Sequence, residues 1–244
     1  MKAYQIFLIY LLINIISSLP SKEKMIENIQ KSSQFKSGKK RTFVVIGKLL
    51  LDKGFEPAFV AGILANIYYE GSIGLFESSN YKSHPEKKPQ YLKYMDELHN
   101  YREKYSHKLV TEVSLNGLKN LMETLHSQNW KKGKFGLGCV QWTGERTRSL
   151  VKLYLEEANG KDRITLDEAT RAEGRMIYNE LTGNYKKIYN EWKSSNSKKI
   201  DSLNAAYQAG SIICRKYEVP ADYKRKGDIR GKMATTFYSV MIKS

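Results

Sequence analysis

The sequence predicts a mainly α-helical fold of the α+β kind, in which a helical bundle carries a cleft and at most a small β-hairpin region. Two observations lead to this prediction. Apolar residues recur at helical spacing in most segments after residue 42. By contrast, residues 133–144 contain four glycines among aromatic and apolar residues, which is typical of tight turns or short hairpin strands. The chain of 244 residues is long enough to bury a sizeable core.

Residues 1–18 have the pattern of a signal peptide. Met1 and Lys2 precede an apolar run from Ile6 to Ile16, and Ser17 and Ser18 follow it. The run is shorter than the roughly 20 residues that a bilayer span needs. We therefore expect a cleaved signal peptide and no stable membrane anchor. The protein would then be extracellular, or would lie in the lumen of a secretory or phagocytic compartment.

The rest of the chain divides into a polar segment at 19–41 and a domain at 42–244. The polar segment is rich in Lys and Ser with a weak apolar period, so we expect a linker or a loosely docked helix. Within the domain, the charged stretch at about 78–134 is interpreted as an insertion. Its tyrosines would either line a sugar-binding cleft or, as we favour, pack the insertion onto the body: Tyr81, Tyr91, Tyr94, Tyr101 and Tyr105.

The helix from Pro57 to Glu70 is predicted to be the centre of the fold. Proline suits the first turn of a helix. Phe59, Ile63 and Ile67 precede Glu70 at steps of four, four and three, so the carboxylate lies on the same stripe as three large apolar side chains. Small residues on this helix should let a neighbouring helix approach closely: Ala58, Ala61, Gly62 and Ala65.

A carboxylate at the end of this helix is expected to act as a general acid. Loss of water around Glu70 and the negative pole of the helix macrodipole should both raise its pKa, which suits an acid working near neutral pH. We expect Gly71 to end the helix in the left-handed conformation and so place Glu70 at the lip of a cleft. The alternative is that Glu70 turns to solvent or pairs with a lysine.

Capping residues predict the later helices. An amphipathic helix is expected at 114–128, and Thr165 with Glu168 has the spacing of a capping box that opens another. Asp201 is expected to cap a helix that ends before Pro220, and a last helix should span 228–241.

The formal net charge of +16 predicts an anionic partner. We see no zinc finger, aromatic ribonucleoprotein motif or basic recognition helix, so nucleic acid is not expected. Anionic polymers of the bacterial wall and acidic membranes remain, and the alternative is a merely solvated lysine-rich surface. The two cysteines, Cys139 and Cys214, are expected to form one disulfide in an exported protein. The histidines are scattered, so neither a metal site nor another cofactor is expected.

Four segments in this order resemble the phage tail lysozyme domain, a branch of the lysozyme-like superfamily. The helix segment from Ala61 to Glu70 matches the family pattern A-G-I-L-x-N-I-x-x-E, and residues 136–146 match G-x-G-x-x-Q-W-T-G-x-R. Asn179-Glu180-Leu181 and the Y-E-x-P-A segment at 217–221 follow. The resemblance covers roughly residues 42–242 apart from the insertion. The chain departs from the family at Gly71-Ser72-Ile73 and in the long spacing between Glu70 and Gly136.

The resemblance implies a lysozyme-like fold and cleavage of the β-1,4 bond between N-acetylmuramic acid and N-acetylglucosamine in peptidoglycan. Glu70 would be the general acid. Glu77 is the candidate second carboxylate, with a surface charge as the alternative. Gln141 and Thr143 would orient water or a sugar amide, and Trp142 would either offer its face to a sugar ring or pack in the core.

The reaction type and two rival functions stay open at this stage. An inverting hydrolase, a retaining hydrolase and a lytic transglycosylase all fit, because no second carboxylate is assured. A non-enzymatic cationic protein that binds bacterial walls or membranes would keep the scaffold and the charge, while an enzyme acting on chitin or chitosan would keep the chemistry. We expect a monomer.

Overall fold

The computed structural model describes residues 19–77, 105, 108–130, 134–220 and 222–244, and it confirms a mainly α-helical fold. Within these residues, β-structure is limited to isolated bridges that join Leu75 to Leu109, Phe76 to Leu137 and Leu137 to Trp142. The helical elements are α2 (Lys22–Lys31), α3 (Ser37–Asp52), α4 (Pro57–Glu70), the 3-10 turn η2 (Val110–Glu112), α7 (Leu115–Ser127), α8 (Glu145–Ala158), α9 (Leu166–Thr182), α10 (Lys186–Ser195), α11 (Leu203–Ile213), the π-helical turn η3 (Cys214–Glu218) and α12 (Tyr223–Met241).

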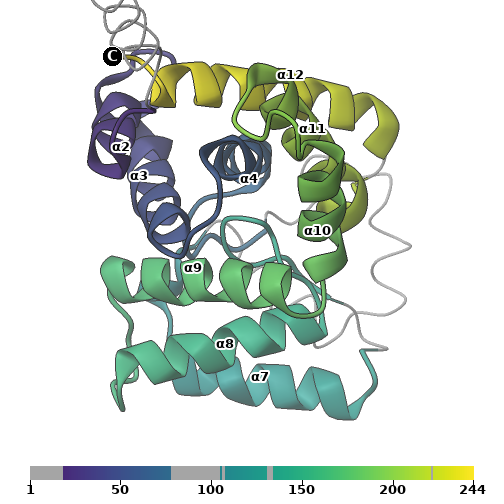
Figure 1. Cartoon of the computed structure of the whole chain (residues 1–244). Helices are drawn as coiled ribbons and strands as arrows, with labels where there is room; N and C mark the ends of the chain where they lie inside the picture. Colours follow the sequence, from purple (N-terminus) through teal and green to yellow (C-terminus); the bar gives the residue numbers. More distant parts are fainter. Residues whose placement is uncertain (1–18, 78–104, 106–107, 131–133, 221) are drawn as a thin grey trace, which may run out of the picture.

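Helix α4 is the buried centre of the fold, as predicted. Its residues from Ala58 to Ile67 are all buried, which is typical of a helix that is apolar on every side. Helices α3, α11 and α12 pack around it (Figure 1). At Gly62 a Cβ atom would lie only 2.5 Å from the Cβ of Ala209, so glycine is needed for the close approach of α11. Pro57 occupies the first turn.

Helix α2 forms part of the polar segment that was expected to be a linker or a loosely docked helix. Its Met25 and Ile29 are buried, and it packs against α3 and α12. Asn28 donates to the backbone carbonyls of Met241 at 3.1 Å and Lys243 at 2.7 Å. The segment before the family motifs is therefore fastened to the C-terminal end of the described structure.

Two loops next to the C-terminal end of α4 replace a regular hairpin. Residues 72–77 lie beside residues 134–142, and Gly138 N–H donates to the carbonyl of Leu75 at 3.0 Å. Leu137 and Trp142 exchange backbone hydrogen bonds at 3.0 Å each way. The glycine-rich segment thus turns sharply next to the end of the central helix.

The helix ends confirm some sequence predictions and correct others. Thr165 and Glu168 form the capping box of α9, and the apolar residues of the predicted amphipathic helix are buried in α7. Ser202, not Asp201, caps α11, because its hydroxyl accepts from Ala205 N–H. The Asp201 carboxylate instead accepts from Ala58 N–H at the start of α4, at 3.4 Å.

Gly71 also differs from its prediction. It follows α4 with φ −146°, which is extended and not left-handed. A Cβ atom there would lie 2.6 Å from the carbonyl oxygen of Gly138 and 2.9 Å from the Gln141 amide nitrogen. Glycine is required because the two loops press against the helix end, while its backbone conformation is open to any residue.

Part of the predicted insertion lies outside the described residues, including Tyr81, Tyr91, Tyr94 and Tyr101. Tyr105 is buried and stacks on Phe76 with ring centroids 5.0 Å apart, which fits a packing role for this tyrosine. Among the helices that the structure describes, none has the length and apolar character needed to cross a membrane.

Candidate functional site

Glu70 is held at the end of α4 by a buried arginine. Its Oε1 accepts a hydrogen bond from Arg230 on α12, and the two side chains form an ion pair. The Arg230 side chain is 4% exposed and that of Glu70 is 21% exposed. Glu70 therefore turns neither freely to solvent nor toward a lysine. Its carboxylate sits at the edge of the protein with one oxygen committed to the interior.

Asn66, one turn before Glu70, fixes the position of that arginine. Its side-chain oxygen accepts from Arg230 at 2.9 Å, while its amide donates to the carbonyls of Gly62 at 2.9 Å and Gly210 at 3.0 Å. The polar groups in this buried network of hydrogen bonds have partners, so the guanidinium has little freedom to move. Asn66 thus ties α4, α11 and α12 together beneath Glu70.

Glu218 is a second carboxyl group, and the charge of Glu70 acts on it. It ends the π-helical turn η3. The residue is half-buried, but its Oε1 has almost no accessible surface and accepts no hydrogen bond from the described residues. Burial, together with the neighbouring Glu70 charge, raises the pKa of Glu218 to about 8.

Glu180 on α9 joins three segments of the chain. It accepts from the indole N–H of Trp142 at 2.9 Å, from Arg146 at 2.7 and 2.9 Å, and from the hydroxyl of Tyr217. The Arg146 guanidinium also lies over the Tyr217 ring, 4.6 Å from its centroid. The residues of three separate motifs therefore meet at one carboxylate.

Glu173, two turns earlier on α9, fastens the two loops at the end of the central helix. It accepts from the N–H groups of Gly74 at 2.6 Å and Cys139 at 2.7 Å, and from the Tyr154 hydroxyl at 2.6 Å. The carboxylate is buried, and burial raises its pKa. Its role is to hold the loops in place beside Glu70.

Glu77 takes part in the contact between the same loops. Its Oε2 accepts from Gly136 N–H at 2.8 Å, and its own N–H donates to the Gly136 carbonyl at 2.9 Å. The carboxylate is therefore already used to position the glycine-rich loop. A chemical role for Glu77 as the second catalytic group stays a prediction.

Gln141 and Thr143 occupy different environments in the glycine-rich loop. The Gln141 amide donates to the carbonyls of Leu75 at 3.1 Å and Gly138 at 2.8 Å, so its nitrogen serves the loop itself. Thr143 is exposed. Binding of substrate by these two side chains stays a prediction.

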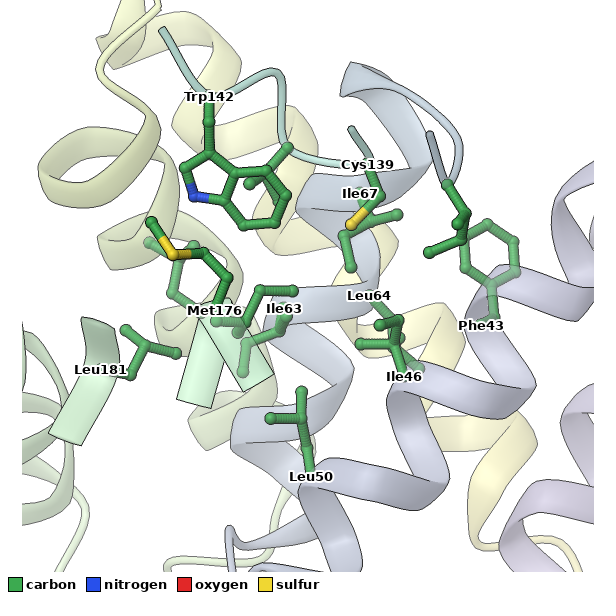
Figure 2. Close-up of a cluster of buried hydrophobic side chains, with 14 of the residues drawn as sticks. Phe43, Ile46, Leu50, Ile63, Leu64, Ile67, Cys139, Trp142, Met176 and Leu181 are labelled. Atoms are coloured by element: carbon green, nitrogen blue, oxygen red, sulfur yellow. The ribbon is translucent and has the colours of Figure 1, made fainter. Parts of the chain in front are cut away.

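Trp142 does not offer a face to a sugar, and we correct that prediction. Its side chain is 0% exposed and lies within the buried cluster that includes Ile63, Ile67 and Met176 (Figure 2). The indole N–H reaches Glu180. Of the two roles considered for this residue, the structure therefore supports core packing.

The predicted disulfide is also corrected, because Cys139 and Cys214 are free thiols in the structure. Both are buried. Burial raises the pKa of Cys214 and raises that of Cys139 well above its usual range. Buried thiols of this kind behave as small apolar side chains and contribute to packing.

The residues that sequence reasoning missed are Asn66, Glu180, Glu218 and Arg230. A signal for Arg230 was present, since it shares one stripe of the last helix with Gly227, Gly231 and Ala234, all buried. A charge on an apolar stripe is the same pattern that identified Glu70. Glu218 and Glu180 stood within the quoted motifs, but nothing in their spacing showed what their side chains contact.

Neither a cluster of metal-binding groups nor the cavity between α8 and α9 adds to the site of Glu70 within the described part of the chain. No group of three or more His, Cys, Asp or Glu side chains is placed there to hold a metal ion. The cavity between α8 and α9, of about 580 Å³, is lined by Arg146 and Glu180 among others but does not include Glu70.

The raised pKa of Glu218 predicts how stability depends on pH. The folded chain keeps this proton up to about pH 8, whereas an unfolded glutamate releases it near its usual pKa of 4.5. The folded state therefore binds more protons between these values, and stability must fall as pH rises. We expect the free energy of unfolding to drop by roughly 3 to 5 kcal/mol between pH 5 and pH 8.5.

Denaturant titrations at the two pH values, at constant salt, measure this drop. In a Glu218→Gln variant most of the drop should disappear. A wild-type stability that stays constant or rises over this range would show that the Glu218 carboxyl is not held neutral.

The fold and the site together define a class of protein. A mainly helical domain whose buried central helix ends on a partly exposed glutamate is consistent with a lysozyme-like fold. The sequence pattern of the phage tail lysozyme family matches residues 45–241, so the chain belongs to that family. No curated protein and no solved structure matches the chain. Membership indicates a lysozyme-like peptidoglycan hydrolase in general, with glycoside hydrolase or lytic transglycosylase activity.

Proposed function

We propose that the protein is a secreted muramidase that cleaves the β-1,4 bond between N-acetylmuramic acid and N-acetylglucosamine, with Glu70 as general acid and an antibacterial role. The observation that carries the proposal is the position of Glu70 within a family of peptidoglycan-cleaving enzymes. It ends the buried central helix and is partly exposed, in contact with a fixed guanidinium. The signal-peptide pattern at 1–18 supports secretion.

In the proposed reaction, Glu70 gives a proton to the glycosidic oxygen as the bond to the sugar's anomeric carbon breaks. The electron pair of that bond stays on the oxygen, and positive charge develops on the sugar ring. Water that attacks the anomeric carbon and releases one proton to solvent completes hydrolysis, whereas attack by the 6-hydroxyl of the same muramic acid, with loss of its proton to solvent, completes a transglycosylase reaction. Arg230 then faces the Glu70 carboxylate that remains after its proton has gone.

The substrate class can be tested by comparing three glycans. We expect the mature protein to release soluble fragments from purified peptidoglycan, but not from chitin oligosaccharides or chitosan. Cleavage of the chitin-type glycans alone would assign the enzyme to that substrate. Binding to walls without cleavage of any glycan would favour the non-enzymatic cationic protein.

Binding to whole bacterial walls should weaken with salt. The net charge of +16 would be attracted to anionic wall polymers, and screening shortens that attraction from about 10 Å in 0.1 M salt to about 3 Å in 1 M. We expect the fraction bound in a sedimentation assay to fall at least several-fold between these concentrations. Walls stripped of teichoic acids are the control, and equal binding at both salt concentrations would contradict an electrostatic partner.

A further inference from the structure

The central helix emerges from the core at the residue just before Glu70. Every residue of α4 from Ala58 to Ile67 is buried, whereas Tyr69 is 43% exposed. Binding sites for small molecules typically combine aromatic faces with a few polar groups, and here an aromatic ring adjoins a partly exposed carboxylate. Since single exposed apolar residues are ordinary on protein surfaces, what distinguishes Tyr69 is the set of contacts that its ring makes.

Tyr69 and Glu70 contact the same guanidinium group. The guanidinium carbon of Arg230 lies over the Tyr69 ring, 5.9 Å from its centroid, and the same group donates a hydrogen bond to Glu70 Oε1. Consecutive residues of a helix do not face each other, so this shared contact is what relates the ring to the carboxylate. Arg230 is buried and held by Asn66. The ring and the carboxylate therefore lie within the span of a disaccharide of one another, in a fixed arrangement.

A second set of contacts supports Tyr69 from α3. Its ring centroid lies 5.1 Å from that of Tyr68, with 77° between the two ring planes. Lys39 donates to the carbonyl of Tyr68 at 2.8 Å, and its Nζ lies 5.9 Å from the centroid of the Tyr68 ring. Perpendicular ring pairs and cations over rings are both favourable arrangements. A ligand would thus meet a ring already held in place, and little side-chain entropy would be lost on binding.

The surface of Tyr69 matches the chemistry of a sugar in a β-1,4-linked glycan. A pyranose carries hydroxyl groups around its rim and C–H groups on its faces, so a face of the sugar can pack on an aromatic ring. The Tyr69 ring is flat and apolar, and its hydroxyl can donate and accept hydrogen bonds at the edge. A sugar held there would be fixed relative to Glu70, which is how an enzyme brings a reacting bond to a catalytic group.

We propose that Tyr69 is a substrate-binding residue whose ring stacks on a sugar next to the glycosidic bond that Glu70 protonates. The inference rests on the proposed function and names a residue that holds its substrate. In the motif A-G-I-L-x-N-I-x-x-E, Tyr69 occupies a position at which the pattern fixes no residue. The contact is therefore a property of this chain, and the motif alone does not imply it.

The first test is the steady-state kinetics of Tyr69→Ala and Tyr69→Phe with soluble, peptide-free glycan strands. We expect KM to rise about tenfold or more in Tyr69→Ala, because the apolar surface that the sugar would cover is lost. Tyr69→Phe keeps the ring and loses one hydroxyl, so its KM should stay within about threefold of wild type. A fall in kcat with KM unchanged in Tyr69→Ala would overturn the proposal, since the ring would then act only by holding Arg230 and Glu70.

Leu203→Ala is the matched control for the loss of an exposed apolar side chain. Leu203 is 51% exposed at the start of α11. Its near neighbour Asp201 contacts Ala58 at the opposite end of α4, roughly 18 Å along the helix from Glu70. The KM of this variant should stay within about twofold of wild type. A rise as large as that in Tyr69→Ala would overturn the proposal.

Tyr69→Leu guards against an alanine variant that fails to fold. Leucine keeps apolar bulk at this position but not the flat ring. Its KM should also rise at least several-fold while its melting temperature stays close to that of wild type, and an unchanged KM would overturn the proposal.

The second test does not depend on activity. In the Glu70→Gln background, titration calorimetry measures the Kd of a peptide-free tetrasaccharide of alternating N-acetylglucosamine and N-acetylmuramic acid. We expect this Kd to rise about tenfold or more when Tyr69→Ala is added. An equal Kd with and without Tyr69→Ala would overturn the proposal even if the wild type cleaves peptidoglycan. Tyr69-dependent binding in a protein whose wild type cleaves no glycan would support the sugar contact and overturn the proposed function.

Discussion

Glu70→Gln should reduce the rate of peptidoglycan cleavage by about a hundred- to ten-thousand-fold, which is the range that a general acid contributes. The amide has the size of the carboxyl but cannot release a proton with similar ease. Its oxygen can still accept from Arg230, which holds Glu70 in the wild type. We therefore expect a folded variant with almost no activity, measured by release of dye from labelled peptidoglycan.

Glu27→Gln is the matched control for this substitution. Glu27 lies on α2, is 42% exposed and pairs with Lys24 and Lys31 of its own helix. The same chemical change there should leave cleavage within about twofold of wild type, because exposed pairs contribute little. A Glu70→Gln variant that retains more than a tenth of wild-type activity at its own optimum pH would exclude Glu70 as the acid.

Glu180→Gln should lower the free energy of unfolding more than the other proposed substitutions do. The Glu180 carboxylate acts as an acceptor in its hydrogen bonds with Trp142, Arg146 and Tyr217. An amide would turn an N–H group toward one of these donors and leave Arg146 without its charge partner. Breaking a buried pair in this way costs about 3 to 5 kcal/mol. For a chain of this size, Tm should fall by roughly 10 °C in a thermal melt followed by circular dichroism.

Glu156→Gln is the control for that loss. It is the same change in another glutamate paired with an arginine, Arg175, but the Glu156 side chain is 57% exposed. Its cost should stay below about 1 kcal/mol. Equal melting temperatures for the two variants would mean that the contacts of Glu180 do not hold the loops and the π-helical turn together.

Local patterns were enough to predict the helical class and the central helix. The steps of four, four and three before Glu70 reflect one face of a helix, and the small residue Gly62 is where α11 approaches. Such features depend on neighbours within a few residues. The capping box at Thr165 was predictable for the same reason.

Contacts between distant segments were not predictable in this way. Asp201 has the right type and position to cap α11, yet it accepts from α4, because tertiary packing brings that helix start closer. Arg230 reaches Glu70 across 160 residues of sequence. From the sequence, Trp142 could stack on a sugar or pack in the core. The structure decides between the two, because the indole N–H donates a hydrogen bond to the buried Glu180 carboxylate. The disulfide was inferred from the expected oxidising compartment and the even number of cysteines, and neither of these indicates how far apart the two thiols lie.

The most direct test of the proposed function is mass spectrometry of the fragments that the mature protein releases from purified peptidoglycan. We predict disaccharide-peptide fragments that end in reducing N-acetylmuramic acid, produced by wild type and not by Glu70→Gln. Fragments with 1,6-anhydro ends would change the reaction to that of a lytic transglycosylase. Fragments that end in reducing N-acetylglucosamine, or equal amounts of fragments from the two proteins, would contradict a muramidase with Glu70 as its acid.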